Sequence, residues 1–332
     1  MTRNIKEFVN QNGLGASVEF PTRMGEDHVC ILLGLYNGAA NLKPQLLSLA
    51  KQSHKDWSLI ISDDGSLDDW FGTVSGFADR HAPGRTWLMQ GPQTGFAQNF
   101  LSLVRRAGPI VPYAAFCDQD DIWLRYKLAR ALAHLKAVPE GLPGLYAART
   151  MICDADLTPL RRSPLFKRRP SFENALVQSI GGGNTMVINR AALDLLQDTA
   201  PRASGVVAHD WWAYQLVSGA GGVVLYDRTP SVLYRQHPDN AVGASDTLLA
   251  GLQRMHHVAK GRFRTWNDAN IDALDRSRPW LTPDAANTLD HFKAARAGRL
   301  HRRLQALWRS GATRQRLRGT LALFAAAAIN RL

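Results

Sequence analysis

Five aspartates form two short clusters, each after an apolar segment: Asp63 with Asp64, and Asp118 with Asp120 and Asp121. If both segments are strands of one sheet, the carboxylates meet at one edge. Their repulsion there destabilises the fold unless a cation or hydrogen-bond donors compensate. Such oxygen ligands suit Mg²⁺ or Mn²⁺, which in turn bind phosphates. The pattern therefore predicts a site for a metal ion and a nucleoside diphosphate or similar diphosphate.

Alternating strands and helices must position these carboxylates. The expected strands are 28–35, 57–62, 86–90 and 113–117, and the expected helices are 43–52, 67–80 and 96–106. This alternation is typical of βαβ crossovers and predicts an α/β domain with a mostly parallel sheet. Ligands bind such sheets beyond the carboxyl ends of the strands, where Tyr36 and Asn37 follow the first strand. A single Asp after a strand often caps the next helix, and we expect this of Asp68.

Other motifs and segments narrow the class further. There is no GxGxxG after the first strand and no GxxxxGK[ST], which disfavours a dinucleotide-dependent dehydrogenase and a P-loop kinase. Three widely spaced cysteines match neither a disulfide framework nor a zinc site and fit a reducing cytoplasm. Residues 1–27 are polar and unpatterned, so we expect a loose arm without a signal peptide. The longest apolar run, 321–329, is shorter than the roughly 20 residues of a membrane span.

The positive charge is concentrated at the end of the chain. The 332 residues carry a formal net charge of +12, and residues 291–332 hold ten Lys and Arg without any Asp or Glu. This segment also carries apolar residues at helical spacing, before and after Ser310-Gly311: Leu300, Leu304, Leu307 and Trp308, then Leu317, Leu321 and Phe324. Helices of this kind either lie on an anionic membrane surface or pack onto the main domain, and a homodimer interface is a further alternative. No nucleic-acid recognition module accompanies the charge, so nucleic acid is not expected.

Several ordered motifs resemble the inverting glycosyltransferases of family 2, which have the GT-A fold, and most closely their rhamnosyltransferase-like group. These motifs are LYNG (35–38), IISDDGSLDD (60–69), GFAQNF (95–100), FCDQDDIW (116–123), GGGNTMVINR (181–190), HDWW (209–212) and YRQHPDN (234–240). The resemblance implies a GT-A catalytic domain over 28–245, followed by a basic helical region over 246–332.

The resemblance also implies roles for individual residues. The nucleotide-sugar site would comprise Tyr36, Asn37, Asp63, Asp64, Asp118 and Arg235. Asp120 and His237 would bind the metal ion, Mg²⁺ or Mn²⁺. Asp210 would be the general base, its pKa raised by the apolar Trp211 and Trp212, although Trp212 is as well explained by core packing. The acceptor side would include Gly183, Asn184 and Trp211.

The function implied is metal-dependent, inverting transfer of a sugar to a hydroxyl of a growing bacterial cell-surface polysaccharide or lipid-linked oligosaccharide. The expected donor is dTDP-L-rhamnose, with a UDP-hexose or a GDP-sugar as the alternative. The expected acceptor is linked to polyprenyl diphosphate, which places the enzyme in the cytoplasm on the inner face of the cytoplasmic membrane. From another class, the alternative is a non-catalytic basic scaffold on a nucleotide-binding fold, which the acidic sheet edge disfavours.

Overall fold

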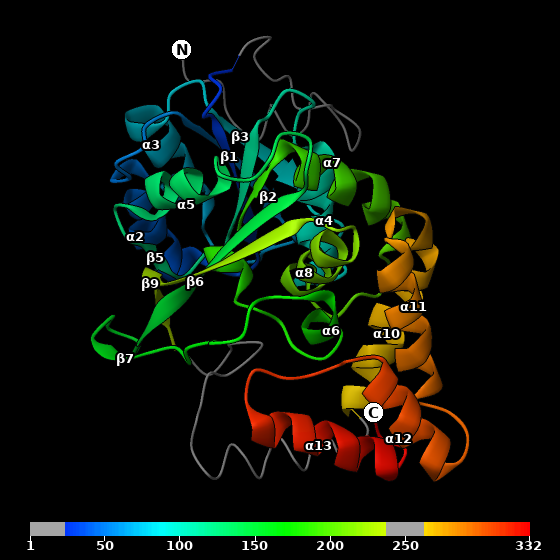
Figure 1. Ribbon diagram of the computed structural model, residues 1–332. Helices are drawn as coiled ribbons and strands as arrows, with labels where there is room; N and C mark the ends of the chain where they lie inside the picture. Colours follow the sequence, from blue (N-terminus) through cyan, green and yellow to red (C-terminus); the bar gives the residue numbers. More distant parts are fainter. Residues whose placement is uncertain (1–23, 237–261) are drawn as a thin grey trace.

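The computed structural model describes residues 24–236 and 262–332, and in them a nine-stranded sheet carries helices on both faces (Figure 1). The strands are β1 (Val29–Leu35), β2 (Trp57–Asp63), β3 (Thr86–Gln90), β4 (Tyr113–Cys117), β5 (Ile122–Trp123), β6 (Gly144–Cys153), β7 (Pro159–Arg162), β8 (Val187–Asn189) and β9 (Val223–Arg235). The helices are α2 (Ala39–Ala50), α3 (Phe71–His81), α4 (Phe96–Arg106), α5 (Lys127–Leu135), α6 (Phe172–Ala175), α7 (Arg190–Thr199), α8 (His209–Gly219), α10 (Arg262–Arg276), α11 (Pro283–Ala294), α12 (Leu300–Arg309) and α13 (Leu317–Ala328). Short 3₁₀ turns are η2 (Gly183–Thr185), η3 (Ala200–Arg202) and η4 (Arg278–Trp280).

The strand order is β3-β2-β1-β4-β8-β6-β9-β5, with β7 beside β6. The first four strands along the chain pair in parallel, as the βαβ alternation predicted. Beyond β4 the sheet is mixed, because β8 pairs antiparallel with both β4 and β6 while β6 and β9 run parallel. The α/β fold is thus confirmed, and its parallel part holds the ends of β1, β2 and β4 at one edge.

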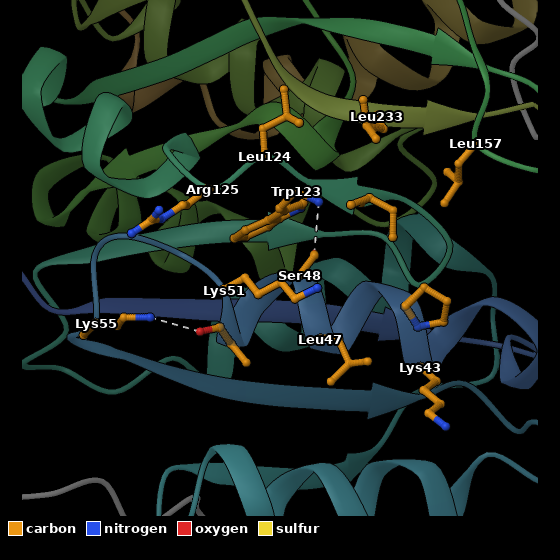
Figure 2. A pocket seen from close by; sticks show the side chains of 13 residues that line it. Lys43, Leu47, Ser48, Lys51, Lys55, Trp123, Leu124, Arg125, Leu157 and Leu233 are labelled. Carbon is orange, nitrogen blue, oxygen red and sulfur yellow. Dashed lines mark hydrogen bonds between the residues drawn. The ribbon is translucent and has the colours of Figure 1, made fainter.

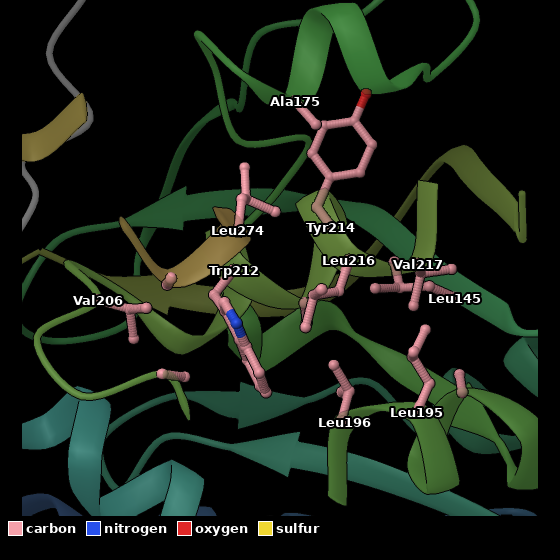
Figure 3. Close-up of a cluster of buried hydrophobic side chains, with 14 of the residues drawn as sticks. Leu145, Ala175, Leu195, Leu196, Val206, Trp212, Tyr214, Leu216, Val217 and Leu274 are labelled. Carbon is pink, nitrogen blue, oxygen red and sulfur yellow. The ribbon is translucent and has the colours of Figure 1, made fainter. Parts of the chain in front are cut away.

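Two hydrophobic cores cover the two faces of the sheet. Alternate residues of β1 point into different cores, so Val29, Ile31 and Leu33 pack with α2, α3 and α5, while Cys30 and Leu32 face the core that includes α4, α7 and α8. This explains why the strand is apolar throughout: burial on both faces removes the alternation of a half-exposed strand. Figure 3 shows the second core around Trp212, which is 1% exposed.

Two predicted helices differ at their starts. The helix expected from residue 67 begins at Phe71. The residues before it, 66–68, instead make hydrogen bonds to Asn37 and Ala39, which follow β1. Asp68 does not cap that following helix. Its Oδ2 instead accepts a hydrogen bond of 2.7 Å from the N–H of Ala39, and this contact caps α2, which begins four residues earlier than expected.

The C-terminal helices share a core with the sheet domain. Leu274 and Leu289 are 0% exposed and belong to the same cluster as Trp212 and Leu216. The N–H of Thr282 also donates to the carbonyl of Gly219 at the end of α8. The expected C-terminal helical extension is confirmed for the described residues 262–332, and one face of it packs onto the main domain. The expected N-terminal arm lies mostly outside the described residues.

Candidate active site

Gln119 joins the ends of β1 and β4. Its side-chain amide donates to the carbonyl of Tyr36 at 2.9 Å, and its Oε1 accepts from the N–H of Tyr36 at 2.8 Å. Gln119 stands between Asp118 and Asp120, so this two-point contact brings the predicted nucleotide residue Tyr36 to residues 118–121, which we call the carboxylate loop. The ring of Tyr36 is 56% exposed and open to a ligand. Sequence analysis did not predict this role, because a glutamine between aspartates does not indicate which backbone groups it contacts.

Asn37 joins the ends of β1 and β2. Its N–H donates to Ser66 Oγ at 2.8 Å, and its Oδ1 accepts from the N–H of Leu67 at 2.8 Å. Asp63 accepts from the N–H of Ser66 at 3.1 Å. Asn37 itself has a φ of 47°, a left-handed conformation that asparagine tolerates better than most residues. The structure therefore brings the ends of β1, β2 and β4 together at one rim, as the sequence predicted.

Asp64 is 7% exposed and holds the loop before α4. Its two oxygens accept hydrogen bonds from the N–H groups of Gln93, at 2.6 Å, and Gly95, at 3.1 Å. Burial raises the pKa of Asp64 despite these donors. Both oxygens therefore already accept hydrogen bonds from the backbone. The predicted contact of Asp64 with the base or ribose stays a prediction.

Asp118 lies close to several other carboxylates at the ends of these strands. Its pKa is raised well above the usual range, first by burial and then by the charges of Asp121, Asp120 and Asp210. A divalent cation would relieve this repulsion, so the donor chemistry of Asp118 and Asp120 fits such an ion. Within 24–236 and 262–332 no three His, Cys, Asp or Glu side chains are arranged so that they could hold a metal ion by themselves.

Asp121 braces the carboxylate loop instead of facing a ligand. It is 1% exposed, and it accepts hydrogen bonds from the side-chain amide of Asn184 and, at 3.1 Å, from the N–H of Arg235. The guanidinium of Arg235 donates to the carbonyls of Asp120, at 3.0 Å, and Ala155. Asn184 and Arg235, expected at the acceptor and the nucleotide, thus both hold the protein together here, because both are buried beside Asp121.

Asp210 lies in the first turn of α8 and contacts η2. Its Oδ2 accepts from the N–H of Gly183 at 3.0 Å, and its Oδ1 accepts from its neighbour Trp211 at 2.6 Å. Burial raises the pKa of Asp210 to about 6, while these two donors oppose the shift. A carboxyl group with this pKa is ionised at neutral pH and still basic enough to take up a proton.

Gly183 has no room for a side chain. A Cβ at this position would lie 2.4 Å from Nε2 of His209. The ring of His209 is 4% exposed and stacks on Phe100, with 3.8 Å between the ring centroids. Burial lowers the pKa of His209 to about 3, so the ring is neutral at pH 7. Gly183 therefore lets the turn approach α8 closely enough for its N–H to reach Asp210.

The comparison with known families now decides the class. Residues 30–195 match the family model described as Glycosyl transferase family 2, which is half of the chain. The chain belongs to glycosyltransferase family 2. The family assignment agrees with the acidic rim at the ends of β1, β2 and β4.

Relatives of this family 2 glycosyltransferase agree in sequence and in fold. The dTDP-rhamnosyl transferase RfbG of Shigella flexneri is 27% identical over 240 residues, which cover 70% of this chain and 81% of RfbG. The structure of residues 1–349 of TarS from S. aureus aligns with a TM-score of 0.50 at 14% identity, covering 91% of this chain and 90% of TarS 1–349. The same TarS fragment in complex with UDP-GlcNAc also gives 0.50 at 14% identity, covering 86% and 92%. This chain spans 53% of the longer TarS structure that it matches.

Three predicted residues remain: Trp211 and Trp212 of α8, and His237. Trp211 is 7% exposed, and its indole N–H donates to the carbonyl of Ala175 at 2.6 Å. The ring is buried against α6 in this structure, and its role at the acceptor stays a prediction. Trp212 lies in the core, as its alternative interpretation held. His237, the second predicted metal ligand, lies outside the described residues.

A separate cavity lies between α2 and β5 (Figure 2). It measures about 850 Å³ and is lined by apolar side chains, among them Leu47 and Trp123, with Lys43, Lys51 and Arg125 at its margins. None of the predicted site residues lines it. This cavity is therefore separate from the predicted site at the ends of β1, β2 and β4. No helix in the described part of the transferase has both the length and the apolar character that crossing a membrane requires.

Proposed function

We propose that this transferase moves a sugar with inversion at the anomeric carbon and that Asp210 is the general base. The observation that carries the proposal is the environment of Asp210. It is held at the start of α8 by two backbone donors, and burial raises its pKa to about 6. Asp210 also lies close enough to the carboxylate loop to affect its titration, since the charge of Asp210 is among those that raise the pKa of Asp118.

The reaction exchanges one carbon–oxygen bond for another. The acceptor hydroxyl gives its proton to the carboxylate of Asp210 while its oxygen bonds to the anomeric carbon. The bond from that carbon to the diphosphate oxygen breaks on the opposite face, and the nucleoside diphosphate leaves with the electron pair. The hydrogen bonds from Gly183 and Trp211 fix the orientation of the Asp210 carboxylate and lower the cost of positioning the base.

Asp120 would hold the metal ion, Mg²⁺ or Mn²⁺, with His237 as a further candidate ligand, and Asp118 would face the ribose or the donor sugar. When bound, the ion would offset the negative charge of the leaving diphosphate. Gln119 and Asp121 keep the two aspartates in place by holding the loop from both sides. Tyr36, Asn37, Asp63, Asp64 and Arg235 are the proposed residues around the nucleotide.

For the donor we propose dTDP-L-rhamnose, which is supported by the relation to the dTDP-rhamnosyl transferase RfbG at 27% identity. A UDP-hexose or GDP-sugar is the alternative. The proposed acceptor is a hydroxyl of a polyprenyl-diphosphate-linked glycan of a bacterial surface polysaccharide, approaching from the side of Gly183, Asn184 and Trp211. With such an acceptor, we place the enzyme on the inner face of the cytoplasmic membrane.

A panel of nucleotide sugars tests this function. The purified protein is heated with dTDP-rhamnose, UDP-hexoses and GDP-sugars, each with Mg²⁺ or Mn²⁺, because a donor that binds the native state raises the melting temperature. The best donor is then incubated with a lipid-linked acceptor, and the anomeric configuration of the product is read by NMR. We expect the largest shift from dTDP-rhamnose and an inverted product. A retained configuration would overturn the mechanism, and a larger shift from another donor would overturn the choice of sugar.

A further inference from the structure

The last helix, α13, carries apolar residues on two faces. Its inner face belongs to the core shared with α8, and the buried residues there are Leu323, Ala326 and Ala327. On the outside, Leu317 is 65% exposed, Leu321 is 60% exposed, and Ile329, directly after the helix, is 62% exposed. A helix that only packs on its own domain normally carries polar residues on its outer face. We call Leu317, Leu321 and Ile329 the outer face of α13.

The segment that carries this outer face is rich in exposed arginines. Neither α12 nor α13 contains an Asp or Glu. Six of the ten basic residues of 291–332 are exposed: Arg299, Arg302, Arg309, Arg316, Arg318 and Arg331. Other basic residues of this segment serve the fold. Lys293 pairs with Asp275 at 2.5 Å, Arg296 donates to the carbonyl of Leu332 at 2.8 Å, and Arg303 donates to the carbonyl of Ala327 at 2.9 Å.

We propose that the outer face of α13 is the surface through which the enzyme binds an anionic membrane leaflet. Leu317, Leu321 and Ile329 enter the boundary between headgroups and acyl chains, and the exposed arginines contact lipid phosphates. This combination of apolar side chains and unbalanced positive charge is what interfacial helices use. A second copy of the chain fits less well, because a symmetric contact would bring two sets of arginines together without any acid from either helix.

The linker between α12 and α13 ties this surface to the helix that carries Asp210. The side-chain amide of Asn174 in α6 donates to the carbonyl of Thr313 at 2.8 Å, and the N–H of Gln315 donates to Gln178 Oε1 at 3.0 Å. α6 in turn contacts α8 through the bond between Trp211 and Ala175. Figure 1 shows α13 below α6 and α8. Membrane contact would thus hold the active site in a fixed orientation to a lipid-linked acceptor, a consequence that rests on the proposed function.

Co-sedimentation of the full-length protein with vesicles tests the surface, one set made of phosphatidylcholine alone and one with phosphatidylglycerol added. We expect binding to the anionic vesicles. In the variant Arg318→Gln/Arg331→Gln, affinity should fall about 25-fold, because each basic residue near such a surface contributes about a fivefold change. In the variant Leu317→Ser/Leu321→Ser it should fall about tenfold or more through lost apolar burial.

Matched variants elsewhere on the surface are the controls. Arg80→Gln/Arg105→Gln removes two exposed arginines from α3 and α4, and Ile110→Ser removes a side chain that is 42% exposed. Both should bind vesicles as the wild type does. Failure of the wild type to bind, or equal losses in test and control variants, would overturn the proposal. So would a lower melting temperature of Leu317→Ser/Leu321→Ser, or a change from dimer to monomer, since either shows that protein already covers this face. Binding needs no sugar nucleotide, so its failure is distinct from failure of the proposed transfer.

Discussion

The carboxylate of Asp121 accepts a hydrogen bond from the side-chain amide of Asn184 and thereby joins the two halves of the active site. Asp121 belongs to the loop that carries the donor-side aspartates, and Asn184 belongs to the turn whose glycine holds Asp210. The N–H of Arg235 completes the contact from β9. This buried side chain therefore helps to set the position of the donor-side aspartates relative to Asp210, the proposed base.

Replacing Asp121 by Ala should destabilise the protein. The change leaves the buried amide of Asn184 and the N–H of Arg235 without their acceptor, and an unsatisfied buried donor costs about 1–3 kcal/mol. We expect the free energy of unfolding in urea to fall by about 2–6 kcal/mol, from two such donors. Asp79→Ala, which removes an exposed aspartate of α3, is the control. Equal stability of the two variants would show that the hydrogen bonds to Asp121 do not stabilise the fold.

Replacing Gly183 by Ala should impair both folding and turnover. The new Cβ would lie 2.4 Å from the ring of His209, so the turn must move away and its N–H must leave Asp210. We expect a loss of about 1–3 kcal/mol in stability and a lower kcat. Gly72→Ala in α3 is the matched control, since nothing lies within 4 Å of its Cβ position. A Gly183→Ala variant that behaves like the control would contradict the close approach.

The pH dependence of kcat should report the ionisation of Asp210. The base works only when deprotonated, and burial places its pKa at about 6. Because the pKa is raised, activity should be lost at a higher pH than for an ordinary carboxylate: kcat rises from pH 5 to pH 7, with a midpoint near 6. The measurement is initial rates at saturating donor and acceptor. A flat profile between pH 5 and pH 8 would argue against this assignment.

Asp120→Ala should remove the effect of divalent ions on nucleotide binding. Asp120 is the proposed carboxylate ligand, so its loss removes the charged oxygen donor that binds the ion. Titration calorimetry with the donor nucleotide, with and without Mg²⁺ or Mn²⁺, measures the difference. We expect the metal-dependent gain in affinity to disappear while the metal-independent part remains. An unchanged gain would assign the ion to other residues.

The sequence predicted the part of the site that local patterns determine. Strand 113–117 and helix 96–106 match β4 and α4, and the polar residues after β1, β2 and β4 do meet at one rim. The roles of Gln119, Asp121 and Asp68 could not be predicted, because each depends on a partner far away in the chain: Tyr36, Asn184 and Ala39. A residue type shows which hydrogen bonds are available, whereas only the fold shows where they are used.

The apolar residues of the C-terminal helices also show that the fold decides which contacts are made. Helical periodicity predicted α12 and α13, but it treated their apolar residues as one face with one partner. In the structure Leu307 and Leu323 pack on the domain, at 0% and 3% exposure, while Leu317 and Leu321 remain outside. The spacing of apolar residues identifies the helix, and burial of its neighbours decides which side is left free.

The most direct test of the catalytic proposal is a comparison of donor binding and transfer in Asp210→Asn. The amide keeps the shape of the side chain and removes the base, so the dissociation constant of the nucleotide sugar should stay within a factor of about two, while kcat falls by a factor of about 10² to 10⁴. Turnover close to that of the wild type would contradict the role of Asp210.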